Sequence, residues 1–399
     1  MPLRKLKHAT TILLMKTLAG LGPSPAYLAY TGSGSAAGLC RHIVRTGVRR
    51  LLVVTDRPLR DLGLVDAALA GFAGSTVELV IFDGVEPNPT YAQVAEGRAI
   101  MLDQGCEAVL AIGGGSSIDA AKIIAASASS TEDPTTWVGF GKVRHEVPKI
   151  YAMPTTSGTG SEATMGSVIS DNVTHEKGII SGAVLLPAAV ALDSDLLLGM
   201  PPAITAATGM DALTHAIEAY ICVWDRGTRK EHSAMAVKMI FEHLRDAVAD
   251  GGNREAREAM ALAAYYAGIA INQVNVGNVH AIAHQLGGKY GVPHGLANAL
   301  VLPHVLEYCR SEARTALAEL AVLIDLGKPG EDADSLAGRF IEAVKTLRAD
   351  VGIPDKAEQL RAEDYDYLTD LALKECESYP VPRLLEREPT LAILRAITP

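Results

Sequence analysis

Three histidines lie close together in the stretch GNVHAIAHQLGGKYGVPHG, residues 277–295. His280 and His284 are four residues apart, a spacing that places both on one face of a helix. His294 follows ten residues later, beside Gly295. The whole chain has 11 histidines in 399 residues, so this is a marked concentration. Such a group can bind a metal ion or move protons.

A second stretch, TGMDALTHAIEAY, carries Asp211 and His215, which are also four residues apart. Apolar residues recur around them at helical spacing, and the flanking segments are apolar as well, so we expect both faces of this helix to be buried. A buried carboxylate needs a partner, and a metal ion is a suitable one. The plainer alternative is that these are histidines satisfied inside an ordinary core.

The two stretches together supply five candidate metal ligands: Asp211, His215, His280, His284 and His294. Nitrogen and oxygen donors without a thiolate suit Fe²⁺ or Zn²⁺ better than Ca²⁺ or a structural zinc finger. His280 and His284 form an H-x-x-x-H pair, but they lack the adjacent glutamate of the zinc proteases. The sequence therefore predicts a metal site, while spacing alone leaves open which four residues bind.

A glycine loop, Gly113-Gly114-Gly115-Ser116, follows the strand-like run at 107–112 and precedes an alanine-rich helical stretch. Glycines let the backbone approach an anion, which the N–H groups of the next helix then bind. Ser116 or Ser117 can cap that helix, and Asp119 lies in its first turn. Because the spacing is not G-x-G-x-x-G, a dinucleotide site and a tight structural turn both stay open.

Two further features favour a dinucleotide. The loop PTTSGTGSE, residues 154–162, also follows a strand-like run, and its hydroxyls and glycines suit a diphosphate or a nicotinamide amide. Asp56 ends the strand-like run at 49–56, where a carboxylate can accept both ribose hydroxyls and favour NAD over NADP. The alternative for the loop at 154–162 is a capped helix start, and the alternative for Asp56 is a helix cap before Pro58.

The first half of the chain alternates between strand-like and helical segments. We predict strands at 49–56, 77–83, 107–112, 150–154 and 190–193. Strand–helix–strand units at these spacings indicate a mostly parallel sheet. After about residue 200 the patterns are long and helical, with few β-branched runs. We therefore predict an α/β domain with a parallel Rossmann-like sheet over 1–199 and an all-α domain over 200–399.

Composition narrows the classes of function. The formal charge is −10 and the basic residues are scattered, which argues against a nucleic-acid partner or an anionic membrane surface. No apolar run is long enough to span a bilayer, and the apolar patch near the N-terminus is too short for a secretory signal. The five cysteines form no C-x-x-C pair, which fits a reducing compartment. We expect a cytoplasmic protein.

Five motifs occur in this order along the chain: FDGVEPNPT, AIGGGSSIDAAKIIA, MPTTSGTGSEAT, MPPAITAATGMDALTHAIEAY and HAIAHQLGGKYGVPHGLANALVLPHV. With these motifs the chain resembles the iron-containing (group III) alcohol dehydrogenases. The resemblance is strong over roughly residues 30–310 and looser over the last 90, where it rests on DVGIP and the helical pattern. It implies the dehydroquinate synthase-like fold, an α/β domain followed by an all-α domain.

The resemblance also implies different roles for the histidines. It implies that Asp211 and His215, together with His280 and His294, hold the metal, which would be Fe²⁺, with Zn²⁺ possible. The middle histidine, His284, would lie off the metal near the nicotinamide and relay a proton or orient that ring. It further implies residues that contact NAD: Asp56, Asn88, Gly113, Gly114, Gly115, Ser116, Asp119, Thr155, Thr156, Thr159 and Lys177.

The activity implied is hydride transfer between a small alcohol and NAD in a cleft between the domains, with the metal acting as a Lewis acid. A glycerol-dehydrogenase-like polyol enzyme, a dehydroquinate-synthase-like cyclase that uses NAD only transiently, and a non-catalytic regulator that binds metal and nucleotide are the alternatives. The cyclase would need basic residues for a phosphorylated substrate, and these are sparse around the histidines. A homodimer is expected from the frequency of dimers among soluble proteins.

Overall fold

The computed structural model describes residues 2–20, 26–173, 176–225 and 227–399. Its contacts divide the chain into two compact units. The sheet unit comprises Pro25–Met200 and Gly252–Gly268, and the helical unit comprises Met1–Ser24, Pro201–Gly251 and Ile269–Pro399. Helix α9 (Arg254–Val274) begins in the first unit and ends in the second.

A six-stranded sheet with strand order β1-β9-β6-β4-β2-β3 forms the centre of the sheet unit, and each neighbouring pair is parallel. The strands are β1 (Ala29–Thr31), β2 (Arg50–Val54), β3 (Glu78–Phe82), β4 (Ala108–Gly113), β6 (Lys149–Pro154) and β9 (Ala189–Leu192). Strands β4 and β9 are buried along their whole length, which explains their continuous apolar runs. Because all strands run the same way, the loops after β2, β4 and β6 meet at one edge.

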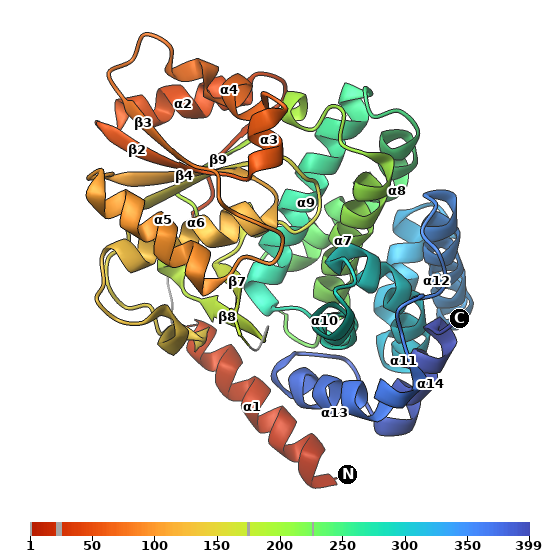
Figure 1. Ribbon diagram of the computed structural model, residues 1–399. Coiled ribbons are helices and arrows are strands. Elements are labelled where there is room, and N and C mark those ends of the chain that lie inside the picture. Colours follow the sequence, from red (N-terminus) through yellow and green to blue (C-terminus); the bar gives the residue numbers. More distant parts are fainter. Residues whose placement is uncertain (1, 21–25, 174–175, 226) are drawn as a thin grey trace. The chain divides into compact units, whose positions relative to one another are not determined.

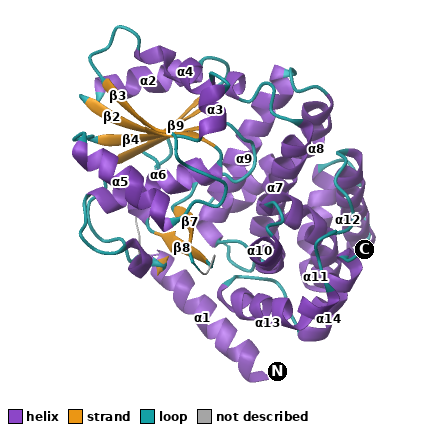
Figure 2. Ribbon diagram, in the orientation of Figure 1, coloured by secondary structure: helices purple, strands orange, loops and turns teal. Residues whose placement is uncertain are grey.

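Helices cover both faces of this sheet (Figures 1 and 2). They are α2 (Ser35–Arg45), α3 (Arg57–Asp61), α4 (Leu64–Leu69), α5 (Tyr91–Asp103) and α6 (Gly115–Ala128). Figure 1 shows α2 and α4 on one side of the strands and α5 and α6 on the other. Leu39, Ile43, Val53 and Leu110 belong to one buried cluster that joins α2 to the sheet. The alternation of strands and helices thus buries a core against the sheet, as the sequence predicts.

A second, three-stranded sheet was not predicted. It has the order β5-β8-β7 and consists of β5 (Gly139–Phe140), β7 (Gly166–Ser170) and β8 (Lys177–Ser181). Strands β7 and β8 pair antiparallel, and β5 adds in parallel. Its strands are short and contain glycine and serine, so they lack the apolar alternation by which a strand is recognised in a sequence.

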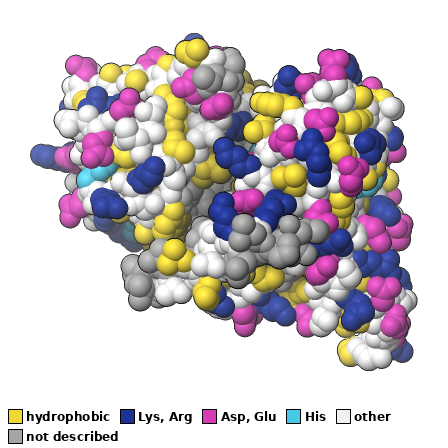
Figure 3. Space-filling view, turned by 90° about the horizontal axis from the view of Figure 1, so that it is seen from below, with side chains coloured by type: hydrophobic (Ala, Val, Ile, Leu, Met, Phe, Trp, Pro, Cys, Tyr) yellow, Lys and Arg dark blue, Asp and Glu magenta, His cyan; other side chains and the backbone are white. Residues whose placement is uncertain are grey.

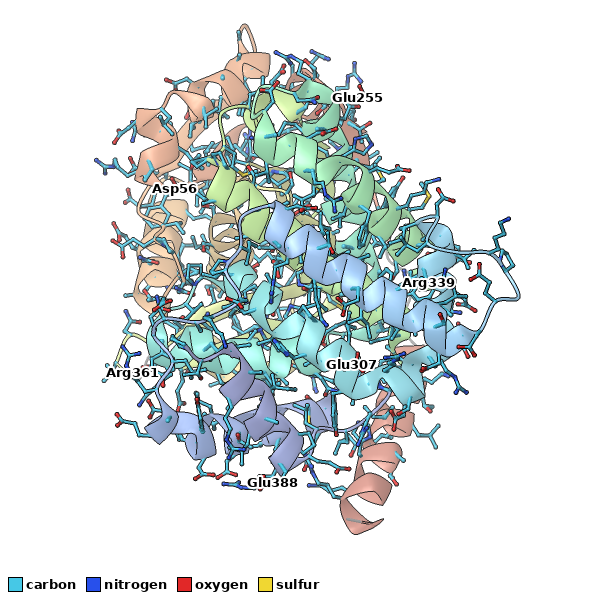
Figure 4. The ribbon with its side chains drawn as sticks, turned by 90° about the vertical axis from the view of Figure 1, so that its right-hand side faces the viewer. Asp56, Glu255, Glu307, Arg339, Arg361 and Glu388 are labelled. Atoms are coloured by element: carbon cyan, nitrogen blue, oxygen red, sulfur yellow. The ribbon has the colours of Figure 1, made fainter. Side chains whose placement is uncertain are left out.

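The helical unit consists of packed helices: α1 (Pro2–Gly20), α7 (Pro202–Ile221), α8 (Arg229–Ala249), α10 (Asn278–Tyr290), α11 (His294–Leu323), α12 (Ala333–Asp350), α13 (Tyr365–Glu375) and α14 (Arg387–Ile397). Helix α7 is buried on both faces, as expected from its sequence. It packs against α8 and α11, and α11 packs against α12. Figure 4 shows these last two helices side by side, with Glu307 labelled on α11 and Arg339 on α12.

Helix α1 was not predicted either, and it packs on the helical unit. Ile12 lies in a buried cluster with Trp224 and Val274. The Arg4 side chain donates hydrogen bonds of 2.7 Å to the carbonyl oxygens of both Leu373 and Leu385. The first helix therefore braces the loop and helix end at 373–385.

The predicted fold class is confirmed: a parallel α/β sheet precedes a helical half. Among the described residues, no helix is both long and apolar enough to cross a membrane. On the face drawn in Figure 3, basic side chains are interspersed with acidic ones.

Candidate metal centre and cofactor loops

Three helices of the helical unit bring four predicted metal ligands together. Asp211 and His215 lie one turn apart on α7, His280 lies on α10, and His294 is the first residue of α11. One ligand atom from each of the four residues can be chosen so that all lie within 4.8 Å of one another. Asp211, His215 and His280 are buried, and His294 is partly exposed. The structure thus assembles a compact set of one carboxylate and three imidazoles.

Two glycines explain how the chain brings His294 back to this group. Gly291 ends α10 in the left-handed conformation, with φ of 66°, and lets the chain turn before Pro293 leads into α11. Gly295 lies against α7, where a Cβ atom would be only 2.2 Å from the carbonyl oxygen of Ala207. The close approach of α11 to α7, and with it the position of His294 beside Asp211, therefore requires glycine at 295.

The ring nitrogens of this group face one another. The Nε2 atoms of His280 and His215 are 3.0 Å apart, and Nε2 of His294 is 3.5 Å from Oδ1 of Asp211. Burial, and to a lesser extent the neighbouring imidazoles, lower the pKa of His280 well below its ordinary value. His280 is therefore neutral, the form in which an imidazole binds a metal.

Asn298 is a member of this site that the sequence analysis missed. Its Nδ2 donates to Oδ1 of Asp211 at 2.7 Å and lies 3.1 Å and 3.2 Å from Nε2 of His280 and His294. Polar atoms of three predicted ligands thus surround one amide nitrogen. Asn298 is four residues after His294 on α11, so the i,i+4 spacing that identified the other pairs could also have found it.

Glu218, also missed from the sequence, orients His280 from behind. Its Oε2 is 2.7 Å from Nδ1 of His280, and its two oxygens accept backbone N–H groups of Gly277 and Val279 at 2.7 Å and 2.6 Å. Burial raises the pKa of Glu218 to about 8, although these backbone donors oppose the rise. A cation held by the neighbouring ligands would favour the ionised form of Glu218. As a carboxylate, Glu218 accepts from Nδ1 and leaves Nε2 of His280 facing Asp211, His215 and His294, an arrangement that is common behind histidine ligands of metals.

We predict that Glu218→Gln weakens metal binding about 10- to 100-fold, the usual cost of losing a carboxylate behind a metal-binding histidine. The amide can donate to Nδ1 and favour the wrong tautomer of His280. Competition with a chelating dye on purified protein measures the affinity. Glu319→Gln, on the partly exposed surface of α11, is the control and should bind metal normally. Equal affinity in both variants would contradict this role for Glu218.

His284 lies beside the four-ligand group and outside it. Its ring centroid is 5.6 Å from that of His280 and 5.4 Å from that of His294. Its Nδ1 atom is 2.6 Å from Oε1 of Glu375, at the end of α13. One ring nitrogen of His284 is therefore occupied by a carboxylate 91 residues away, which the sequence analysis did not identify.

The donor set fits a divalent transition metal. Oδ2 of Asp211 is buried and has no hydrogen-bond partner among the residues that the structure describes. A buried carboxylate oxygen without a partner is costly unless a cation compensates it. One oxygen and three nitrogen donors, with no thiolate, suit Fe²⁺ or Zn²⁺.

The two predicted cofactor loops meet at the edge of the sheet in the sheet unit. Strands β4 and β6 pair so that Gly113 lies opposite Pro154, and Thr155 donates its N–H to the carbonyl oxygen of Gly113 at 3.0 Å. A Cβ atom on Gly115 would be 2.8 Å from Thr159, and one on Gly114 would be 3.4 Å from Thr156. The glycines therefore permit the threonine loop to pack directly against the glycine loop.

The start of α6 is suited to an anion. Gly114 is the N-cap and contributes no side-chain hydrogen bond, while Ser116 lies in the first turn. N–H groups in the first turn of a helix have no partner within the helix. With the helix dipole, they form a binding site for a phosphate group.

Asp119 has a different environment from the other predicted cofactor residues. Its carboxylate accepts a short hydrogen bond from the Ser161 hydroxyl and a bond of 2.8 Å from the Val168 N–H. The buried Lys122 next to it donates to the carbonyl oxygens of Ser161 and Gly166 at 2.8 Å and 2.6 Å. Asp119 thus holds the second loop and β7 against α6, and its place beside a pyrophosphate stays a prediction.

The remaining cofactor candidates are Asp56, Asn88 and Lys177. Asp56 caps α3, since its Oδ1 accepts the Leu59 N–H at 2.9 Å, and burial raises its pKa. Asn88 lies in a bend and has a left-handed backbone conformation, with φ of 58°. Lys177 begins β8, where burial lowers its pKa. The cap predicted as the alternative for Asp56 is therefore present, and contact of these three residues with NAD stays a prediction.

Comparisons with known proteins cover nearly the whole chain. Residues 28–194 match the family described as iron-containing alcohol dehydrogenase, and residues 205–398 match the Fe-containing alcohol dehydrogenase family, C-terminal. The chain is 39% identical over 353 residues to 1,3-propanediol dehydrogenase from Klebsiella pneumoniae, covering 88% of this chain and 91% of that protein. It is 34% identical over 355 residues to NAD-dependent methanol dehydrogenase from Bacillus methanolicus, covering 88% and 93%.

A solved structure gives the same result in three dimensions. The crystal structure of 1,3-propanediol oxidoreductase superposes with a TM-score of 0.88 at 36% identity, covering 94% of this chain and 99% of that one. Both the sheet unit and the helical unit are therefore included in the similarity.

Proposed function

Because this chain belongs to the iron-containing alcohol dehydrogenase family, we propose that it transfers hydride reversibly between a small alcohol and NAD. The group of Asp211, His215, His280 and His294 carries the proposal, since its donors suit the metal for which the family is named. A polyol oxidation of the glycerol dehydrogenase type and a non-redox cyclisation are not favoured, because the two relatives named above are dehydrogenases of 1,3-propanediol and of methanol.

Asp211, His215, His280 and His294 would hold Fe²⁺, with Zn²⁺ as the alternative. When bound, the ion supplies Lewis-acid polarisation of the substrate oxygen. Asp211 is the anionic member of the set and partly offsets the charge of the ion. Glu218 keeps Nε2 of His280 directed at the other ligands, and Asn298 fixes the Asp211 carboxylate.

In the sheet unit, the N–H groups at the start of α6 and the glycines of residues 113–115 bind the pyrophosphate of NAD. Thr155, Thr156 and Thr159 line the same edge of the sheet and offer hydroxyls to the cofactor. Asp56 follows β2, next to β4 in the sheet, where its carboxylate can accept from the adenosine ribose. NAD supplies the acceptor for the hydride.

Oxidation of an alcohol to an aldehyde moves a hydride from carbon to NAD⁺ and releases the hydroxyl proton. His284 takes this proton, because its Nδ1 faces Glu375 and leaves Nε2 as the acceptor. In the reverse direction the same nitrogen returns the proton to the aldehyde oxygen. A separate histidine for the proton lets the four ligands stay on the metal.

The test is a panel of short alcohols and diols, assayed for NADH after the protein has been loaded with Fe²⁺ or Zn²⁺. Metal analysis of the same sample and a parallel sample treated with a chelator complete the experiment. We expect NADH formation that depends on the metal and is greatest with small, fairly apolar alcohols. If a fully metal-loaded sample forms no NADH with any member of the panel, the chain is a non-catalytic protein that binds metal and nucleotide.

The protein acts in the cytoplasm as a homodimer. Its five cysteines are free thiols, as a reducing compartment requires, and the dimer is expected from the frequency of that state among soluble proteins.

A further inference from the structure

Glu375 is a partly buried carboxylate with three hydrogen-bond donors around it. His284 Nδ1 lies 2.6 Å from its Oε1, and the Tyr379 hydroxyl donates to the same oxygen at 2.6 Å. Nε2 of Gln285 donates to Oε2 at 2.6 Å. Two of these three donors are neighbours on α10, and the third lies one turn beyond Glu375 itself. Such convergence is typical of a carboxylate that fixes the orientation of another group.

Glu375 is ionised at neutral pH. Burial alone would raise its pKa, but the hydrogen bonds from His284, Tyr379 and Gln285 oppose this rise, and the pKa of Glu375 lies below its ordinary value. Burial and the proximity of Glu375 raise the pKa of Tyr379 well above its ordinary value, so its hydroxyl keeps its proton and remains a donor. An ionised carboxylate only accepts hydrogen bonds, and Nδ1 of His284 must therefore carry a hydrogen.

We propose that Glu375, supported by Tyr379, is a positioning residue that holds His284 in the tautomer and orientation needed to exchange a proton with the substrate. The inference rests on the proposed function. With its hydrogen on Nδ1, the neutral ring has the lone pair on Nε2. Without Glu375, the ring can turn, or its hydrogen can move to Nε2, and it then cannot accept the proton.

The segment that carries Glu375 and Tyr379 is itself held firmly. Arg4 of α1 donates to the carbonyl oxygens of Leu373 and Leu385, which flank both residues. His8 of α1 lies 2.9 Å from the carbonyl oxygen of Tyr379 through its Nε2 atom. An orienting carboxylate must not move with the group that it orients, and these contacts anchor it to a helix other than α10.

The experiment compares wild type, Glu375→Gln, His284→Ala and the double variant in the alcohol assay with NAD. We expect Glu375→Gln to keep its metal and its KM and to lose about 10- to 100-fold in kcat, since orientation is part of the 10²- to 10⁴-fold that a general base contributes. If Glu375 acts through His284, the double variant is no slower than His284→Ala. Glu377→Gln is the matched control, because Glu377 lies in the same turn and its carboxylate pairs with Arg4 and Lys7.

The outcomes separate this inference from the proposed function. An inactive but metal-loaded wild type would overturn the function itself. An active wild type together with an unimpaired Glu375→Gln would overturn only the role of Glu375, as would a double variant in which the two losses multiply. If Glu375→Gln unfolds early or loses metal, the same cycle is run with Tyr379→Phe, which removes one donor and leaves the carboxylate in place. If Tyr379→Phe lowers kcat in the otherwise wild-type chain but not in the chain that carries His284→Ala, the role of Glu375 is supported. If it lowers kcat in both chains, the role is contradicted.

Discussion

His280→Ala should lose its metal and its turnover together. His280 lies at the centre of the group, with Nε2 3.0 Å from Nε2 of His215 and Nδ1 fixed by Glu218. Alanine removes one of four donors and leaves Glu218 buried without its side-chain partner, so we expect metal affinity to fall by at least about 100-fold. Lewis-acid stabilisation is worth several kcal/mol, and turnover at limiting metal should fall about 1,000-fold or more.

Metal content per chain and kcat are measured on the same purified sample. His304→Ala is the control, since His304 is partly buried on α11, the helix that begins with His294, but is not one of the four ligand residues. It should keep metal and activity. Excess Fe²⁺ should partly restore His280→Ala if weak binding causes the loss. Full metal content with normal turnover in His280→Ala would show that the ligand assignment is wrong.

The elements that the sequence predicts well are those whose burial leaves a clear pattern. Strands β2 and β4 are continuous apolar runs because both of their faces are covered, and their predicted bounds differ from the observed ones by two residues or fewer. The strands of the small sheet are short, and their exposed and buried residues do not alternate cleanly. Their pairing depends on contacts with α6 that no local pattern encodes.

In the site, too, some residues are predictable from the sequence and others are not. The pairs Asp211–His215 and His280–His284 are visible because helical spacing places residues four apart on one face. Glu218 is 62 residues from His280, and Glu375 is 91 residues from His284, so only the folded chain reveals these two carboxylates. Yet they distinguish the two histidines of α10: one carboxylate turns His280 toward the other ligands, and the other orients His284 outside that group.

His284→Ala should therefore behave differently from His280→Ala. We expect it to keep its metal, because His284 is not one of the four residues whose ligand atoms lie together. Its kcat should fall about 10²- to 10⁴-fold, the contribution of a positioned general acid or base. Alanine also leaves the ionised Glu375 with Tyr379 and Gln285 as donors, so the fold should tolerate the change.

Metal analysis and kcat on the His284→Ala protein, purified beside His280→Ala, make the comparison direct. We expect His284→Ala to retain metal but turn over slowly, and His280→Ala to lose both metal and turnover. This result would assign proton transfer and metal binding to two histidines one turn apart on α10. Loss of metal from His284→Ala would instead make His284 a fifth member of the metal group. The hydrogen bond that His284 donates to Glu375 would then serve metal binding, as we propose for the one between His280 and Glu218. Small amines added to His284→Ala should restore part of kcat only if the missing function is proton transfer, because an amine can replace a base but not a bond to the metal.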